Sequence, residues 1–409
     1  MTSILSVGFM AGIVGLWLVA RRARRSGINP WLLINLLRAS SHRRSESVHL
    51  LLCIADHFEP ALENATPEVA DARVARWLHD YPRQFSEFRD SDGMPPRYTF
   101  FYPIDQYEPA HVDALAGLCR AGFGEVEVHL HHDADTAENL RETLLTHKRT
   151  MAERHGLGAR DRNTGDLVYA FIHGDWALDN SRPDGRCCGV DNELDVLRET
   201  GCYADFTLPS YPSPAQTRKI NSIYYATDDP KRPKSHDSGI DVGEGPAPEK
   251  ALMLIQGPLA LDWKRRKWGL VPRVENGCIQ GNQPPGIDRL ATWLRARVQI
   301  HNRPDWFFVK LHTHGANERN QPALLGPAMV EFHKALALRA RTNPSFHYHY
   351  VTAREMYNLA KAAEAGWCGS VAAARDYALI WDGDPTAMGQ DPHQIRSDLP
   401  NFGNQCAPT

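Results

Sequence analysis

From Ser47 onward, short apolar runs alternate with longer segments of helical periodicity. The runs expected to form strands are Val48–Ile54, Arg97–Tyr102, Glu125–His131, Leu167–His173, Ala204–Leu208, Ala251–Gln256, Trp306–His312 and His347–Val351. Between most of them, apolar residues recur at spacings of three and four, in Glu68–Arg89, Glu108–Ala121, Thr136–His155, Asp191–Gly201, Gly286–His301, Ala323–Thr342 and Ala353–Ala365. This alternation predicts an α/β fold with a parallel sheet, and seven or eight units favour a distorted (β/α) barrel of about seven strands.

Two long segments do not fit the alternation, and both are expected to be irregular insertions. They are Pro209–Pro248 and Trp263–Pro285. Long loops in a compact domain often bind ligands, so we expect these two to do so.

Charge and cysteine usage exclude some classes of protein. The chain has 46 basic and 49 acidic residues and a net charge of −3, so no basic field indicates nucleic acid as a partner. Its eight cysteines include no C-x-x-C pair, which argues against a zinc ribbon. We expect these thiols to be mostly reduced and buried, which favours the cytoplasm.

Ionisable side chains gather where the expected strands end. The groups are Asp56-His57-Phe58-Glu59, Asp105, the run HLHHD ending at Asp133, His173-Gly174-Asp175-Trp176, and His312-Thr313-His314. In a (β/α) barrel the carboxyl ends of the strands form one rim, so these groups should converge. Several imidazoles and carboxylates facing one cavity predict a divalent metal ion, most simply Zn²⁺.

The stretch EVEVHLHHD, Glu125 to Asp133, carries the densest of these groups. Alternation along a strand places His129 and His131 on one face, with Glu127 beneath them. His132 points the opposite way, which favours a supporting or helix-capping role over ligation. Asp135, four residues beyond His131, is either a further ligand or the N-cap of the next helix.

Four motifs together resemble those of the polysaccharide deacetylases over roughly residues 47–359. They are Asp56-His57, Glu127-x-x-x-His131-x-x-x-Asp135, Asn180-Ser-Arg182-Pro183-Asp-Gly185 and Leu311-His312-Thr-His314. In that family the first motif is Asp-Asp and the second is His-x-x-x-His, so two of the three presumed ligands differ in type.

The resemblance implies a metal-dependent hydrolase that removes acetyl groups from an N- or O-acetylated glycan or a lipid-linked precursor. It assigns Asp56 as general base, His312 or His314 as general acid and Arg182 as the residue that orients the base. The implied metal ligands are His57, His131 and Asp135, with His129 as an additional ligand. His173, Asp175 and Trp176 would contact substrate, and Trp176 offers an aromatic face for a sugar ring.

Three other functions are consistent with the same residues. A metal-dependent amidohydrolase or phosphoesterase also uses His-x-His, although there the pair usually follows the first strand. A catalytically inactive, membrane-anchored glycan-binding or scaffold protein would explain the altered ligands. A glycoside hydrolase would need a pair of acids, for which Glu59 and Asp175 are available, but the many histidines suit it poorly.

The first 46 residues are expected to attach the chain to a membrane. Ile4–Ala20 contains no charge and is followed by four arginines within residues 21–25. Its length is near the lower limit for a span, and it lacks the flanks of a cleavable signal peptide. Positive charge after the span predicts a single-pass inner (plasma) membrane protein whose catalytic domain, 47–365, lies in the cytoplasm. Residues 28–37 are either an interfacial helix or the first core helix, and 366–409 are expected to form an irregular tail.

Overall fold

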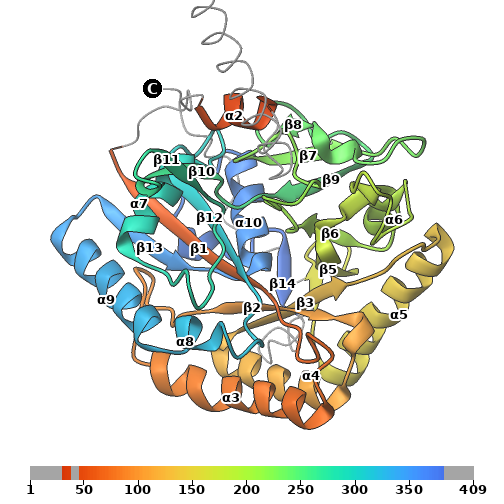
Figure 1. Cartoon of the computed structure of the whole chain (residues 1–409), viewed down its shortest axis with the longest axis horizontal. Coiled ribbons are helices and arrows are strands. Elements are labelled where there is room, and N and C mark those ends of the chain that lie inside the picture. The colour runs from red at the N-terminus through yellow and green to blue at the C-terminus, as the bar shows by residue number, and fades with distance from the viewer. Residues whose placement is uncertain (1–29, 38–45, 382–409) are drawn as a thin grey trace, which may run out of the picture.

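The structure, a computed structural model, describes residues 30–37 and 46–381, which form a mixed α/β fold (Figure 1). The strands are β1 (Val48–His57), β2 (Tyr98–Pro103), β3 (Gly124–Leu130), β4 (Ala159–Asp161), β5 (Leu167–His173), β6 (Cys202–Asp205), β7 (Ile223–Thr227), β8 (Ile240–Asp241), β9 (Ala251–Ile255), β10 (Ala260–Lys267), β11 (Val271–Glu275), β12 (Trp306–Thr313), β13 (Phe346–Tyr350) and β14 (Leu379–Trp381). The helices of eight residues or more are α2 (Pro30–Leu37), α3 (Pro67–Phe85), α4 (Pro109–Leu118), α5 (Ala137–His155), α7 (Ile287–Ala296), α9 (Pro327–Thr342) and α10 (Ala353–Glu364). The shorter α-helices are α6 (Glu193–Glu199), α8 (Gln321–Leu324) and α11 (Val371–Ala374).

Parallel pairing dominates the large sheet, as the sequence predicts. Its strands follow the order β12-β1-β2-β3-β5-β6-β9-β7-β8, and β13 pairs with the first half of β1. All neighbours from β12 to β9 are parallel, whereas β7 and β8 join antiparallel at one edge.

The predicted closed barrel is wrong: within the described residues the sheet stays open. Closure would require β12 to pair with β9, but β7 already occupies the free edge of β9 from Ile223↔Ile255 to Thr227↔Ala251. The end of β12 instead forms a single parallel bridge, Cys278↔His312. Strand β7 lies in the first segment expected to be an irregular insertion, and the second such segment contains most of the β10–β11 hairpin.

Alternation along each strand sorts its side chains between two apolar layers. In β1, Leu50, Leu52 and Ile54 pack outward against the surrounding helices. Leu51 and Cys53 face the concave side, where they pack together with α10, which lies inside the curve of the sheet (Figure 1). A third cluster fills the space between β3, β5, β9 and the helices α5 and α6. The concave face of the sheet is therefore filled with packed side chains.

The two ends of the chain lie mostly outside the described residues. The proposed span Ile4–Ala20 and its arginines fall there, so the structure neither supports nor opposes them. None of the helices in residues 30–37 and 46–381 has both the length and the apolar character that a bilayer crossing needs. At the other end, residues 366–381 include α11 and β14, and β14 pairs with β4.

The cysteines only partly match the expectation of reduced thiols. In the part of the chain that the structure describes, the free thiols are those of Cys53, Cys119, Cys187, Cys188, Cys202 and Cys278. Cys368, by contrast, is disulfide-bonded. Cysteine usage therefore no longer favours a reducing compartment.

Candidate metal centre

The carboxyl ends of β1, β2, β3 and β12 bring five ionisable side chains together, as the sequence predicts. Glu59 follows β1, Asp105 follows β2, His129 and His131 come from the end of β3, and His314 follows β12. These ends are adjacent because the four strands are consecutive neighbours in the sheet. We call this group the Glu59 centre.

The carboxylate of Glu59 lies in the middle of the centre and is almost completely buried. Its Oε1 atom lies 2.8 Å from Nε2 of His131 and 3.4 Å from Nε2 of His129. Its Oε2 atom lies 2.7 Å from Nδ1 of His314. Ligand atoms of Glu59, His129 and His131 all fall within 4.8 Å of one another, a spacing that one metal ion can bridge.

The hydrogen bonding of His129 supports a cation at this position. Its Nδ1 atom lies 2.8 Å from the carbonyl oxygen of Ile172, so Nδ1 carries the proton and donates it. The Nε2 atom then presents a lone pair toward the carboxylate of Glu59, and it has no hydrogen-bond partner. The buried Nε2 of His57 also lacks a partner, and its ring centroid lies 4.9 Å from that of His129. These donor atoms fit a divalent ion of the zinc type.

The charges in the centre are strongly coupled. Burial alone would raise the pKa of Glu59, but the close contacts with His129, His131 and His314 hold that pKa far below its usual value. Burial lowers the pKa of His131, yet its contacts with Asp105 and Glu59 outweigh this and raise the pKa to about 10. Both oxygens of Asp105 lie 3.2 Å from Nδ1 of His131, the arrangement in which a carboxylate orients a metal-ligating histidine.

Asp56, predicted to be the general base, lies on the opposite face of β1 from His57. Its side chain is fully buried, and Oδ1 accepts a 2.6 Å hydrogen bond from the backbone N–H of Gly315. A Cβ atom on Gly315 would lie 2.1 Å from Oδ2 of Asp56 and 2.8 Å from Trp77, so only glycine permits this approach. Asp56 therefore fixes the segment that carries His314, and the geometry favours a positioning role over proton transfer from water.

Arg182 and His312 make other contacts than those that the predicted mechanism assigns to them. The guanidinium of Arg182 pairs with Asp184 in its own loop, at 2.7 Å. His312 is buried beside the Cys278 bridge, with its Nδ1 atom unpartnered. Of the two histidines considered as the general acid, His314 is the one in contact with the Glu59 centre.

The structure separates Asp135 and His173 from His131 and places both of them beside His132. Nδ1 of His132 lies 3.1 Å from Asp135, and Nε2 of His132 lies 2.8 Å from Nε2 of His173. Asp135 does not cap α5 either, because the hydroxyl of Thr136 accepts the capping hydrogen bond. The prediction that His132 points away from His131 is confirmed. Its ring contacts Asp135, His173 and Glu193, which are side chains of the types that can bind a metal ion, and it does not cap a helix.

Trp176, which is expected from the sequence to contact substrate, borders the Glu59 centre. Its ring centroid lies 6.2 Å from those of His57 and His314. The preceding residue, Asp175, is exposed and has a positive φ of 53°. A Cβ on Gly174 would lie 2.4 Å from Cδ2 of His131, so a residue without a side chain lets this loop pack onto the histidine.

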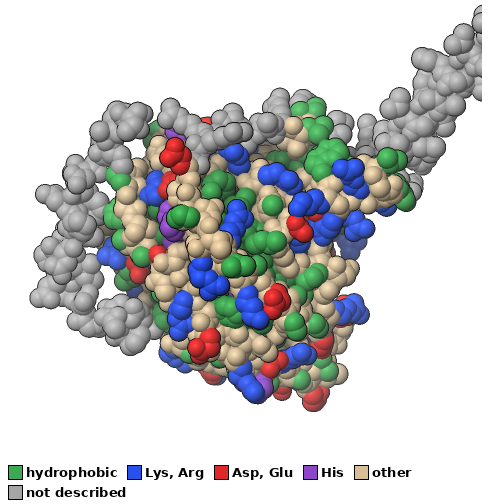
Figure 2. Space-filling view, turned by 90° about the vertical axis from the view of Figure 1, so that its left-hand side faces the viewer, with side chains coloured by type: hydrophobic (Ala, Val, Ile, Leu, Met, Phe, Trp, Pro, Cys, Tyr) green, Lys and Arg blue, Asp and Glu red, His purple; other side chains and the backbone are tan. Residues whose placement is uncertain are grey.

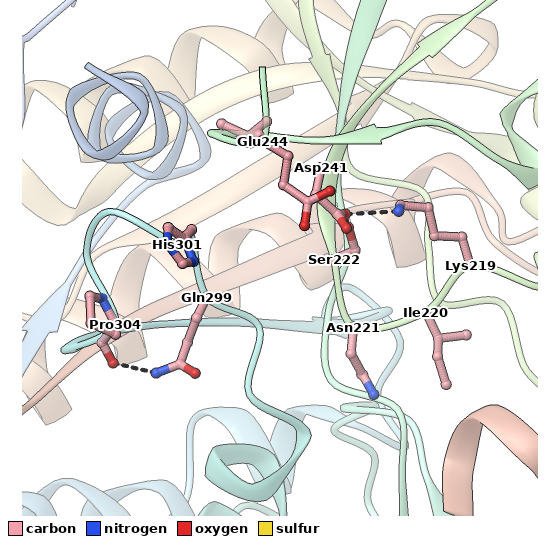
Figure 3. Close-up of a pocket in the computed structure, with 10 residues that line it drawn as sticks. Lys219, Ile220, Asn221, Ser222, Asp241, Glu244, Gln299, His301 and Pro304 are labelled. Carbon is pink, nitrogen blue, oxygen red and sulfur yellow. Dashed lines mark hydrogen bonds and ion pairs between the residues drawn. The ribbon is translucent and has the colours of Figure 1, made fainter. Parts of the chain in front are cut away.

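A separate cavity of about 440 Å³ lies between the β7–β8 edge and the segment that precedes β12 (Figure 3). It shares no residue with the Glu59 centre. Its walls are polar: Lys219 and Asp241 form an ion pair of 2.8 Å, and Glu244 and His301 also face the space. The first segment expected to be a binding loop, Pro209–Pro248, thus lines a cavity. This cavity is separate from the histidine clusters.

Glu59 and Asp105 are among the groups that were expected from the sequence to converge, but neither of them was assigned to the metal. Both were visible at strand ends, but the resemblance directed attention to Asp56 and Asp135 instead. The sequence feature that could have identified Glu59 is its position two residues beyond the end of β1, from which its side chain can turn back toward the strand ends.

The geometry alone carries the functional argument, because comparison of the chain with models of known protein families and with curated proteins finds no match. The likeness to polysaccharide deacetylases therefore rests on the four motifs. Three of their residues, His57, His131 and His314, meet around Glu59.

Proposed function

We propose that the chain is a metal-dependent hydrolase that removes acetyl groups from an N- or O-acetylated glycan or from its lipid-linked precursor. The observation that carries the proposal is the Glu59 centre, a buried carboxylate contacted by three histidines at the carboxyl ends of parallel strands. In open α/β sheets, ligands bind in the crevice beyond those strand ends.

Glu59, His129 and His131 would hold the ion, and His57 would complete the set with its unpartnered Nε2 atom. A divalent ion supplies Lewis acidity, which activates water and polarises a carbonyl group. Asp105 keeps Nδ1 of His131 protonated, so that Nε2 of His131 points to the centre.

His314 is the side chain best placed to move a proton. Its Nδ1 atom is bound to Glu59, which leaves Nε2 to face a substrate, and about a quarter of its side chain is exposed. We assign it the role of general acid, protonating the nitrogen or oxygen that leaves the acetyl group. Asp56 acts through the segment that carries His314, as a positioning residue.

The substrate is inferred from the wall of the centre. Trp176 offers an aromatic face close to His57 and His314, suited to the apolar face of a sugar ring. Asp175, exposed beside it, offers a carboxylate to sugar hydroxyls.

Metal analysis of the purified full chain, combined with acetate release from a panel of acetylated glycans, tests the proposal. His131→Ala should lose metal from the Glu59 centre and nearly all acetate release. His347→Ala is the matched control, because its ring stacks on His49 in β1 and is remote from the centre. Acetate release by metal-free protein would refute the mechanism, and a wild-type chain that binds no metal would favour the scaffold alternative.

We also propose that the chain lies at the inner (plasma) membrane, with the α/β domain on the cytoplasmic side. Helix α2 packs beside β10 (Figure 1). Together with the β10–β11 hairpin it presents apolar side chains to solvent. Trp268 is 72 % and Leu270 79 % exposed, and Leu37 of α2 is also exposed. Basic residues of the hairpin are interleaved with them, and Figure 2 shows basic and hydrophobic side chains side by side on this face. Such a surface suits anionic lipid headgroups.

Quenching by brominated lipids tests this contact. In vesicles containing phosphatidylglycerol, Trp268→Phe should reduce the quenching of tryptophan fluorescence in the full chain. Trp293→Phe removes a buried tryptophan and should leave the quenching unchanged. Equal quenching in wild type and Trp268→Phe would contradict the proposed contact between the hairpin and the bilayer. A C-terminal reporter that is active only in the periplasm tests the side: strong activity would refute the cytoplasmic orientation.

A further inference from the structure

A second cluster of metal-ligand side chains lies directly behind the Glu59 centre. It comprises His132, His173 at the end of β5, Cys188 in the loop that follows β5, and Glu193 in the first turn of α6. Nε2 of His132 lies 3.2 Å from Oε1 of Glu193, and Nε2 of His173 lies 3.4 Å from the same oxygen. Sγ of Cys188 lies 3.5 Å from Oε2 of Glu193. All four side chains are buried or nearly so.

The hydrogen bonds around the two rings leave lone pairs facing one another. Nδ1 of His173 lies 2.6 Å from the carbonyl oxygen of Gly174 and must donate to it. Nδ1 of His132 donates in the same way to Asp135, at 3.1 Å. Each Nε2 atom then carries a lone pair, and the two atoms are only 2.8 Å apart beside a carboxylate oxygen. Buried lone pairs this close repel unless a positive charge lies between them.

A metal ion satisfies this arrangement more completely than a proton does. A proton on Nε2 of His132 would bridge the two rings and leave Cys188 as a neutral thiol that donates to Glu193, whereas a metal ion takes all four side chains as ligands. Zinc held tetrahedrally at about 2.0 Å from nitrogen and about 2.3 Å from sulfur separates its ligand atoms by roughly 3.3 to 3.7 Å. The measured separations, 2.8 to 3.5 Å, lie close to that range.

We infer that His132, His173, Cys188 and Glu193 form a closed structural Zn²⁺ site, distinct from the Glu59 centre. Two imidazoles, a thiolate and a carboxylate fill four positions, and the burial of the ligands leaves none for substrate. The ion links the ends of β3 and β5 to α6 and fixes the loop between β5 and α6. That loop begins with Gly174 and Trp176, which pack against the Glu59 centre.

Cobalt substitution provides a readout specific to this site. The Glu59 centre contains no sulfur, so a sulfur-to-cobalt charge-transfer absorption in the near ultraviolet can come only from a thiolate such as that of Cys188. The full-length chain loaded with Co²⁺ should show this band. Cys188→Ser should abolish it and remove one zinc equivalent per chain. Cys202→Ser, which changes another buried free thiol, should keep both the absorption band and the zinc equivalent.

The outcomes distinguish this site from the proposed hydrolase. His131→Ala should lose the metal of the Glu59 centre and keep the cobalt–sulfur band. A folded wild-type chain that takes up Co²⁺ without the band would overturn the inference and leave a proton between His132 and His173. This outcome is measured on the wild-type chain, so it does not depend on the folding of any variant. Acetate release remains a separate test of the Glu59 centre.

Discussion

Lys310 offers a quantitative test of how the open side of the sheet is held together. It lies in β12, is fully buried, and donates a 2.6 Å hydrogen bond from Nζ to the carbonyl oxygen of Phe206, just beyond β6. It thereby joins the β12 edge to a strand with which β12 does not pair. Burial lowers the pKa of Lys310 from 10.5 to about 8. A shift of that size is worth about 3 kcal/mol of pH-dependent stability.

The sign follows from the direction of the shift. Because the folded-state pKa of Lys310 is below the unfolded value, its contribution to stability is fully present above pH 10.5 and is lost as the pH falls to about 8. Lys310→Met removes this dependence and loses about 1–3 kcal/mol because the Phe206 carbonyl loses its donor. Below pH 8 this loss is offset, because the variant no longer buries a charged amine. The variant should therefore be clearly less stable than wild type near pH 10.5 and comparable to it near pH 7.

Urea unfolding of the full chain at pH values from 7 to 10.5 measures this difference. The free energy of unfolding of wild type, relative to that of Lys310→Met, should rise by about 3 kcal/mol as the pH increases across that range. Lys334→Met, which changes an exposed lysine, should parallel wild type throughout. A difference between wild type and Lys310→Met that does not vary with pH would refute the view that this amine is desolvated.

Three further predictions concern the two metal sites. Gly174→Ala should weaken metal binding at the Glu59 centre by about tenfold or more, because the new Cβ would overlap His131, whereas Gly117→Ala meets open space and should not. Asp105→Asn should lower the metal affinity by about 10–100-fold in a competition assay, while Asp71→Asn, beside His111 on the surface, should not change it. A zinc chelator should lower the melting temperature of the full chain, and readdition of Zn²⁺ should restore it; an unchanged melting temperature would contradict a structural ion.

Periodicity made most of the fold predictable, because each strand or helix is read from its own residues. Leu167–His173 matches β5 at both ends, and the alternation along β3 correctly sorted Val126 and Val128 from Glu127 and His129. That the sheet does not close into a barrel could not be predicted in this way. The open edge depends on β7, a short strand in a segment rich in proline and charge. Its pairing with β9 is a tertiary contact that the local sequence of β7 does not specify.

The candidate site was predictable in outline and not in detail. Strand ends of a parallel sheet converge, so His129, His131 and His314 could be grouped from sequence. Which carboxylate joins them depends on how the loop after each strand turns. A loop of two residues carries Glu59 into the centre, and the strand face carries Asp56 away from it.

The pairing of β1 has a consequence for how the chain folds. Its register joins His49 to Trp306 in β12 and Val48 to Phe346 in β13, so two of its three neighbours are made about 250 to 300 residues later. During synthesis the apolar β1 must remain unpaired on those sides until most of the polypeptide has emerged. Such non-local contacts slow folding and leave aggregation-prone intermediates exposed. A nascent chain of this topology therefore exposes apolar surface of the kind that chaperones bind.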